Sequence, residues 1–351
     1  MRTDLFDFDL PESRIAQNPI EPRDHSKLMV VNRATKTIEH KQFFDIVSYL
    51  NPGDLLVWNN SKVFKARLFG KLFSPEGEAL REHAKPVEIF LVRPTENTGV
   101  WQALAKPGKH VAHGMRITFA NDFSCVVLAK TNDGTILVQF PDHEQEVRDK
   151  ANQYGAVPLP PYIKKGVNEL VAYQTVYAKN EGSVAAPTAG FHFTPELIEK
   201  IKSKGVEFAE VTLHVGLGTF LPVKSELVHD HTMHSEWVEV NPETVEAIRA
   251  TKERGGRVIA VGTTSVRTLE GVASVQGGLR AYTGDINIFI TPGFQFQVID
   301  ALITNFHLPK STLLMLVSAF ANDREFMLGA YKEAVEKEYR FFSFGDAMFI
   351  E

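Results

Sequence analysis

A stretch of short β-type runs lies between two stretches in which helical and strand-like patterns alternate, and this arrangement limits the possible folds. From about residue 62 to 148, apolar runs are broken by Gly, Pro, Asn and Asp. The expected strands are Val63–Leu72, Val87–Val92, Trp101–Ala105, Arg116–Phe119, Phe123–Ala129 and Thr135–Phe140. The clearest turn signal is Asn132-Asp-Gly134. Short strands with little helical periodicity are typical of a small barrel or sandwich.

After the extended link Pro158-Leu-Pro-Pro-Tyr162, helices and strands alternate. The expected helices are Thr194–Lys204, Pro242–Arg254, Ser265–Ala273 and one that begins at Ser311; the expected strands are Val206–Val215, Arg257–Gly262 and Ala301–Thr304. Such alternation indicates an α/β layer with a parallel sheet. Ile38–Leu56 has the same character, so an insertion into one domain is more economical than two domains in tandem.

We therefore predict a discontinuous, barrel-like α/β domain formed by residues 1–58 and 150–351. A small β-barrel domain over residues 59–149 would be inserted into it. The length of 351 residues fits two domains of ordinary size.

The charge of the chain is unevenly distributed. Lys and Arg number 38 against 43 Asp and Glu, and the net charge of −5 argues against a general DNA-coating or membrane-surface protein. Residues 60–120 alone carry ten basic and five acidic side chains, a balance of +5 that leaves −10 for the rest. The insert is therefore basic and the α/β domain acidic.

Several classes of protein are excluded by composition. The longest apolar stretch, residues 313–321, is well below the ~20 residues needed to cross a bilayer, and the acidic N-terminal segment does not resemble a secretory signal. The single cysteine, Cys125, excludes an internal disulfide framework and a Cys-cluster metal site. Its strand-like surroundings predict a buried, unreactive thiol. We expect a cytoplasmic protein without a membrane span.

Three strand-to-helix junctions carry residue types that bind anionic ligands: Gly182–Phe193, Val261–Arg267 and Thr304–Ser311. In parallel α/β folds, ligands collect at the carboxyl ends of strands, where loop amides and helix N-termini stabilise anions. Arg267 and Lys310 add positive charge for a carboxylate or phosphate. For any one junction, ordinary helix capping explains these residues as well as ligand binding does. Three such junctions together indicate a binding face.

Two further patterns are weaker. Gly216-Leu-Gly218 resembles part of a dinucleotide-binding loop, but the Leu-Pro pair at 221–222 does not fit the Rossmann fingerprint. The segment His229–Glu236 holds three His and two acids, yet its spacing matches no zinc motif. We interpret it as a loop before a strand at Trp237–Val240 and expect no metal.

Long motifs follow one another over the whole chain. They are Ile15-Ala-Gln17, Arg23-Asp24, Gly53–Val57, Ala66-Arg67-Leu68, Pro158–Ile163, Tyr173–Ala178, Ser183–Gly190, Thr212–Phe220, Met233–Glu236, Gly262–Arg267, Leu302–Met315 and Tyr339–Met348. In these motifs and their order the chain resembles the S-adenosylmethionine:tRNA ribosyltransferase-isomerase family of queuosine biosynthesis. It departs from the family pattern at Trp58, Asn60-Ser-Lys62, Phe191 and residues 284–291.

The resemblance implies an α/β domain with an inserted β-barrel, in agreement with the pattern above. It also implies that the ribosyl group of S-adenosylmethionine is transferred to 7-aminomethyl-7-deazaguanine at the tRNA wobble position and isomerised. The products would be epoxyqueuosine, adenine and methionine, and the acceptor tRNAs would read Tyr, His, Asn and Asp codons. S-adenosylmethionine would be a co-substrate, no cofactor or metal would be needed, and a monomer is expected.

This reaction requires proton transfers by groups within ~3 Å of the reacting atoms. A base would remove a C5′ proton acidified by the sulfonium; the candidates are His192, His214 and Glu236, although a structural role explains His214 as well. His307 would be the acid for the leaving adenine. The expected substrate-binding residues are Arg23, Asp24, Thr188, Thr263, Thr264, Arg267, Asn305 and Lys310. Among these, Arg267 or Lys310 would hold the methionine carboxylate.

The basic insert is the predicted tRNA contact, with salt-dependent binding to the RNA backbone. The cations expected there are Lys62, Lys65, Arg67, Lys106 and Lys109. Trp101, Phe64 or Phe69 could stack an unpaired base, although a core position explains each of them better.

Two other classes of function are compatible with the pattern. A non-catalytic RNA-binding module would use the basic insert but release no adenine from S-adenosylmethionine. A small-molecule α/β-barrel transferase or lyase would use the junctions without salt-dependent tRNA binding. A methyltransferase fits less well, because the sequence lacks its Gly-rich nucleotide loop, and it would yield S-adenosylhomocysteine.

Overall fold

The structure is a computed structural model that describes residues 1–78, 86–131, 134–164, 170–216 and 225–351. Two residues of the turn predicted at Asn132-Asp-Gly134 lie outside these ranges, as do Gly218 and the Leu-Pro pair at 221–222.

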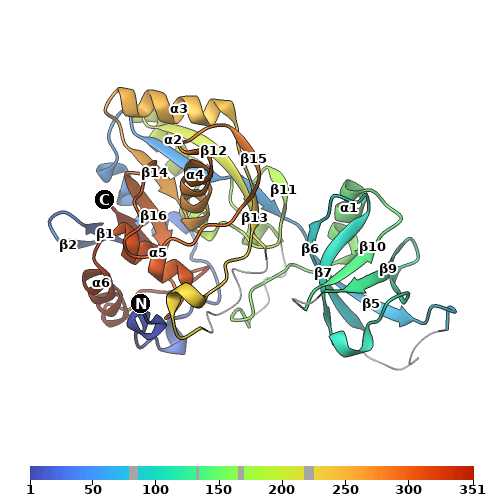
Figure 1. Cartoon of the computed structure of the whole chain (residues 1–351). Helices are drawn as coiled ribbons and strands as arrows, with labels where there is room; N and C mark the ends of the chain where they lie inside the picture. The colour runs from blue at the N-terminus through green and yellow to red at the C-terminus, as the bar shows by residue number, and fades with distance from the viewer. Residues whose placement is uncertain (79–85, 132–133, 165–169, 217–224) are drawn as a thin grey trace.

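A nine-stranded sheet forms the larger part of the molecule, and both termini lie in this part (Figure 1). Its strands are, in spatial order, β15 (Tyr282–Ile286), β13 (Glu236–Val240), β12 (Glu207–His214), β3 (Leu55–Asn59), β14 (Val258–Val261), β16 (Ala301–Asn305), β17 (Ala347–Ile350), β1 (Lys27–Asn32) and β2 (Thr37–Gln42). The four central strands β12, β3, β14 and β16 are parallel, and antiparallel pairs occur toward both edges. The predicted parallel α/β layer is therefore confirmed.

Helices connect and cover these strands. They are α2 (Pro195–Ser203), α3 (Pro242–Glu253), α4 (Thr263–Gln276), α5 (Thr312–Phe320) and α6 (Arg324–Glu336). Shorter 3-10 turns occupy Thr3–Phe6, Glu12–Arg14, Arg23–His25, Phe43–Tyr49, Gly108–His110, Leu170–Tyr173, Thr188–His192 and Val228–Asp230. The four predicted helices are present. Helix α4 is longer than expected, because it begins directly after Gly262 and ends where Gly277 adopts a left-handed conformation.

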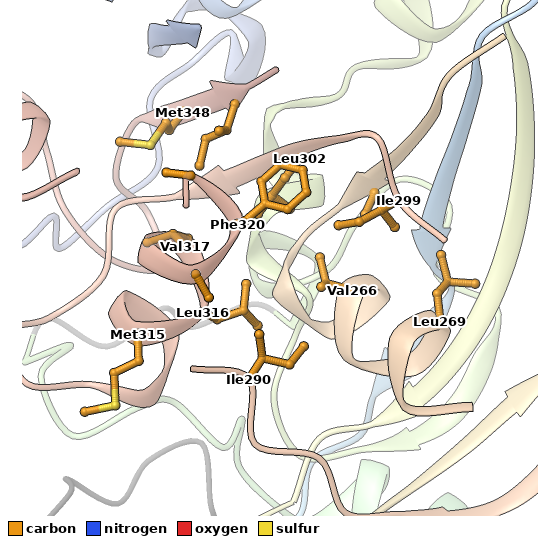
Figure 2. Close-up of a cluster of buried hydrophobic side chains, with 14 of the residues drawn as sticks. Val266, Leu269, Ile290, Ile299, Leu302, Met315, Leu316, Val317, Phe320 and Met348 are labelled. Atoms are coloured by element: carbon orange, nitrogen blue, oxygen red, sulfur yellow. The ribbon is translucent and has the colours of Figure 1, made fainter. Parts of the chain in front are cut away.

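Both faces of the large sheet are buried. Alternate residues of β3 belong to different cores: Leu55 and Val57 to one, Leu56 and Trp58 to the other. Figure 2 shows the first core, where side chains of α4 and α5 surround Leu302 of β16. Helix α2 contributes apolar side chains to the second core. Burial on both faces explains why the central strands are continuous apolar runs in the sequence.

The second part is a closed six-stranded antiparallel barrel beside the sheet (Figure 1). Its strands are, in order around the barrel, β10 (Ile136–Gln139), β7 (Val100–Lys106), β6 (Val87–Pro94), β5 (Arg67–Phe73), β8 (Arg116–Ala120) and β9 (Phe123–Lys130). The predicted α/β fold with an inserted small β-barrel is thus confirmed, but the α/β domain holds a sheet with two edges rather than the expected barrel-like arrangement.

One predicted barrel strand is divided in the structure. Instead of a single strand over Val63–Leu72, the chain forms β4 (Ser61–Val63) and then β5. Strand β4 pairs in parallel with β11 (Asn180–Ser183) outside the barrel. The chain therefore leaves one sheet at Val63 and enters another at Arg67.

Helix α1 (Glu144–Tyr154), which the sequence pattern did not predict, packs against the barrel. Its Val147 and Ala151 lie in the barrel core with Trp101 and Cys125. Cys125 is buried as predicted, and burial raises the pKa of its thiol. The domain boundaries at 59 and 149 stay predictions, and α1 extends past the second of them.

Membrane spans and metal clusters are both absent from the described residues. No helix within these ranges is long and apolar enough to cross a bilayer. The same residues contain no group of three or more His, Cys, Asp or Glu side chains arranged to hold a metal ion.

Candidate active site

A cavity lies at the carboxyl ends of β14 and β16, where the three predicted junctions meet. We call it the junction cavity. It is lined by Tyr162, Tyr173, Ala185, Ala186, Pro187, Thr188, Ala189, Val215, Gly262, Thr263, Thr264, Thr304, Asn305, Phe306, His307, Leu313, Phe342 and Ser343. Five of the residues predicted for the site are among them: Thr188, Thr263, Thr264, Asn305 and His307. The convergence follows from the parallel pairing of β14 with β16, which brings the two strand ends to one edge.

The N-terminus of α4 forms one wall of this cavity. Gly262 follows β14 with φ +87°, a conformation that favours glycine, and Thr263 then begins the helix. No side chain caps the first amides of α4, and the Oγ1 of Thr264 is buried without a partner within the described chain. Free amides at a helix N-terminus attract negative charge or a hydrogen-bond acceptor.

Asn305, the last residue of β16, and His307 also line the junction cavity. The Nδ2 of Asn305 donates to the carbonyl of Phe342 at 2.9 Å. The Nε2 of His307 lies 3.1 Å from the Oγ1 of Thr304. Burial lowers the pKa of His307 to about 3, so its imidazole is neutral at pH 7.

The lining described here combines many apolar residues with a few hydroxyl, amide and imidazole groups, and it contains no Asp, Glu, Lys or Arg side chain. Such a surface suits the hydroxyls and ring nitrogens of a nucleoside. Charged parts of a ligand would have to be bound next to this cavity.

A smaller pocket adjoins the junction cavity at Ser343, which lines both. We call it the arginine pocket; it is lined by Pro19, Ile20, Arg23, Phe191, His192, Arg340, Ser343, Phe344 and Gly345. The predicted residues Arg23 and His192 lie here.

His192 is only 4% exposed. Its Nδ1 lies 2.7 Å from the Oγ of Ser26. Burial lowers the pKa of His192 to about 3, and the positive charges of Arg340 and Arg23 act in the same direction, whereas a hydrogen bond with the side chain of Asn305 acts against them. The second imidazole next to the cavity is therefore also neutral at pH 7.

His214 faces away from the junction cavity. Its ring stacks on Trp237, with centroids 5.0 Å apart, in a polar cleft between α1 and strands β11 to β13. A Cβ atom at Gly182 would lie 2.6 Å from the Nε2 of His214, so glycine is required for this packing. Burial lowers the pKa of His214 to about 4.

The other predicted charged residues pair with one another or with neighbours. Arg267 forms an ion pair with Glu236, and burial raises the pKa of that carboxyl above its ordinary value although Arg267 opposes the shift. The Nζ of Lys310 lies 2.7 Å from the Oδ2 of Asp7. The Oδ1 of Asp24 lies 3.0 Å from the Nδ1 of His25. None of these predicted residues is among the side chains that line the junction cavity or the arginine pocket.

Several lining residues are not evident from the sequence pattern. The hydroxyl of Tyr162 lies 2.5 Å from the Oγ of Ser343, which joins two walls of the cavity. In the sequence, Tyr162 only marks the end of an extended link. Arg340 and Ser343 belong to the motif Tyr339–Met348, whose residues have no predicted role; the motif itself is the available signal.

The barrel cations differ in their surroundings. The Nε of Arg67 lies 3.3 Å from Glu88, and the Nζ of Lys62 lies 3.7 Å from Glu181. Lys65 is partly buried, whereas Lys106 and Lys109 are exposed.

Of the three aromatic residues considered for base stacking, Trp101 and Phe64 lie in the barrel core. The side chain of Phe69 is 48% exposed on β5, so the expectation of a core position is wrong for this residue.

Comparison with known proteins gives the family. The model of the family described as queuosine biosynthesis protein matches residues 3–350. The chain belongs to this family. Proteins named S-adenosylmethionine:tRNA ribosyltransferase-isomerase are 52% identical in Thermotoga petrophila and 50% identical in Finegoldia magna, each over the whole chain. The alignments cover 100% and 98% of those proteins.

A solved structure of a queuosine biosynthesis relative has the same fold. It is the crystal structure of an S-adenosylmethionine tRNA ribosyltransferase from Thermotoga maritima, with a TM-score of 0.56 and 43% sequence identity. The comparison covers 99% of this chain and 100% of the other. The predicted membership of the queuosine biosynthesis family is therefore confirmed.

Proposed function

We propose that this chain is an S-adenosylmethionine:tRNA ribosyltransferase-isomerase. It would transfer the ribosyl group of S-adenosylmethionine to 7-aminomethyl-7-deazaguanine at the wobble position of tRNA and isomerise it. The products would be epoxyqueuosine-tRNA, adenine and methionine. The names of the relatives support the type of reaction. The observation that carries the proposal is the meeting of three family-like junctions at one uncharged cavity, with the neutral imidazole of His307 in it and that of His192 in the adjoining pocket.

The adenosyl part of S-adenosylmethionine would occupy the junction cavity. Thr188, Thr263 and Thr264 offer hydroxyls to the ribose, and Asn305 offers an amide oxygen. The amides that begin α4 would hold an acceptor atom of the ligand. S-adenosylmethionine would act as co-substrate, with no cofactor or metal.

The geometry favours His192 as the base for the C5′ proton. His192 lines the pocket that adjoins the junction cavity, whereas His214 faces another cleft and Glu236 is paired with Arg267. His307, in the junction cavity, would donate a hydrogen bond to the leaving adenine. Both imidazoles are neutral at pH 7, but the low pKa of His192 makes it a weak base, so its assignment rests on its position beside the cavity.

The basic insert would contact the tRNA backbone through Lys62, Lys65, Arg67, Lys106 and Lys109. Lys106 and Lys109 carry the largest expected share, because both are exposed, whereas Glu88 offsets the charge of Arg67. The acceptors would be tRNAs that read Tyr, His, Asn and Asp codons. We further propose that the protein is a monomer that works in the cytoplasm.

The test is to incubate the protein with S-adenosylmethionine and tRNA that carries the deazaguanine amine, and to identify the small products. We expect adenine and methionine only when both substrates are present. If no adenine is released, a non-catalytic RNA-binding module becomes the better explanation. Adenine released without tRNA would indicate a small-molecule enzyme. S-adenosylhomocysteine would indicate a methyltransferase.

A further inference from the structure

The arginine pocket carries positive charge without an acidic side chain in its described lining. Arg23 and Arg340 supply two guanidinium groups, and the neutral His192 lies with them. The other lining residues are apolar, Gly or Ser. A concave site of this composition favours a small oxyanion.

The guanidinium of Arg23 is held in place mainly by neutral groups. It donates from Nη1 to the carbonyl of Gln174 at 2.8 Å and from Nη2 to the carbonyl of Ala172 at 3.2 Å. Its one carboxylate neighbour among the described residues, Glu21, is 73% exposed and lies 3.8 Å from Nε. Burial lowers the pKa of Arg23. A half-buried guanidinium with so distant a carboxylate has capacity for an anionic ligand.

Arg340 is oriented by Asp346 rather than fully neutralised by it. The carboxylate of Asp346 accepts backbone N–H groups of Lys27 at 3.0 Å and Arg340 at 2.8 Å. Its contacts with the guanidinium are longer, 3.3 Å to Nη2 and 3.4 Å to Nε. The Nη1 of Arg340 makes a 3.4 Å contact with the carbonyl of Asn18.

Two short segments line both pockets. The 3-10 turn Thr188–His192 lines the junction cavity with its first residues and the arginine pocket with its last. The segment Phe342–Gly345 does the same, with Ser343 in both. A ligand with a neutral nucleoside at one end and a carboxylate at the other would match this pair of pockets.

We propose that Arg23 and Arg340 bind the carboxylate of the methionyl part of S-adenosylmethionine in the arginine pocket. This assignment rests on the proposed function. The proposed residues differ from Arg267 and Lys310, which the sequence suggested for the methionine carboxylate. Arg267 is already paired with Glu236, and Lys310 is already paired with Asp7. The carboxylate would then lie beside His192, the proposed base.

The test compares two probes that differ only in this group: S-adenosylmethionine and its decarboxylated analogue. Binding of each is measured by calorimetry to the wild-type protein, to Arg23→Gln and Arg340→Gln, and to the control Arg249→Gln. Arg249 lies on α3 in an exposed ion pair, outside both pockets. Melting temperatures confirm folding, and Arg23→Gln carries the test by itself if Arg340→Gln fails to fold.

We expect each pocket variant to bind S-adenosylmethionine about tenfold or more weakly, the usual loss for a charge-assisted hydrogen bond. The same variants should bind the decarboxylated analogue within about twofold of the wild type. The analogue has no carboxylate, so it cannot lose the contact with the substituted arginine. Arg249→Gln should bind both probes as the wild type does.

Equal losses for both probes would overturn the assignment. So would unchanged binding of S-adenosylmethionine together with weaker tRNA binding, which would make the pocket a phosphate site. In both cases the wild type still binds S-adenosylmethionine and releases adenine, so the proposed function stands. A wild type that binds neither probe would instead refute the proposed function.

Discussion

The Nη1 of Arg267 lies 2.5 Å from the Oε2 of Glu236, and the two side chains are only 9% and 4% exposed. Glu236 begins the strand β13, and Arg267 lies in the second turn of α4. The ion pair therefore connects a strand near the edge of the large sheet to the helix whose N-terminus lines the junction cavity.

Removal of one partner of this pair should be costly. Glu236→Ala leaves the Arg267 charge buried and unpaired, and we expect a loss of about 3–5 kcal/mol in the free energy of unfolding. Urea denaturation measures it. Glu246→Ala, which breaks an exposed ion pair with Arg249, is the matched control and should change stability little. Similar small effects of both substitutions would show that the buried pair is not structural.

Acid should destabilise the protein through its buried imidazoles. Burial lowers the pKa of both His192 and His307 from 6.5 to about 3. Between these values the unfolded chain binds more protons than the folded one, so stability is present above pH 6.5 and falls as the pH drops toward 3.

Each such imidazole adds about 1.4 kcal/mol per pH unit to this slope. The stability of His307→Asn should therefore depend less steeply on pH between 6 and 4 than that of the wild type. Unfolding by urea at pH 6, 5 and 4 gives both slopes. Equal slopes for the two proteins would mean that His307 binds its proton in the folded state as readily as in the unfolded state, which would contradict a lowered pKa.

Two aromatic residues of the barrel should behave differently on substitution. Trp101 is 1% exposed in the barrel core, and Trp101→Ala should cost about 3–5 kcal/mol of stability. Phe69→Ala should leave the melting temperature nearly unchanged but weaken tRNA binding by about fivefold or more, if Phe69 stacks an unpaired base. Unchanged tRNA affinity for Phe69→Ala would remove this residue from the RNA surface.

The barrel cations should account for part of the salt dependence of tRNA binding. The double variant Lys106→Gln, Lys109→Gln tests this. In a plot of the logarithm of the tRNA association constant against the logarithm of the salt concentration, the magnitude of its slope should be smaller by about 0.7–0.9 for each phosphate that is no longer neutralised. Binding of S-adenosylmethionine should not change, because neither Lys lines the junction cavity. Equally weakened binding of tRNA and S-adenosylmethionine would contradict a separate RNA surface on the barrel.

The site could be predicted in part, because the carboxyl ends of parallel strands meet at one edge of a sheet. The junctions around Thr188, Thr263 and Asn305 are distant in the sequence but line one cavity. The prediction of His214 shows the limit of this reasoning. His214, the last residue of β12, lines the cleft beside α1, while the next residue, Val215, lines the junction cavity.

Charged residues are harder to place, since their partners are distant in the sequence. Nothing local to Arg267 indicates Glu236, and nothing local to Lys310 indicates Asp7. Arg340 lies in an irregular segment without periodicity, so only its position in the fold shows that it lines a pocket.

Two helices, α6 and α1, are missing from the sequence prediction for different reasons. Helix α6 could have been predicted, because its buried residues Met327, Ala330, Tyr331 and Ala334 have regular helical spacing. Helix α1 buries only Val147 and Ala151, so its charged sequence gives a weak signal.

The most direct test of the proposed reaction follows two labels of S-adenosylmethionine into tRNA. One sample carries the label in the ribose and the other in the methyl group, and each is incubated with the protein and tRNA bearing the deazaguanine amine. The proposed reaction predicts that the ribose label enters the tRNA while the methyl label leaves with methionine. Methyl label in the tRNA, or no ribose label there, would contradict it.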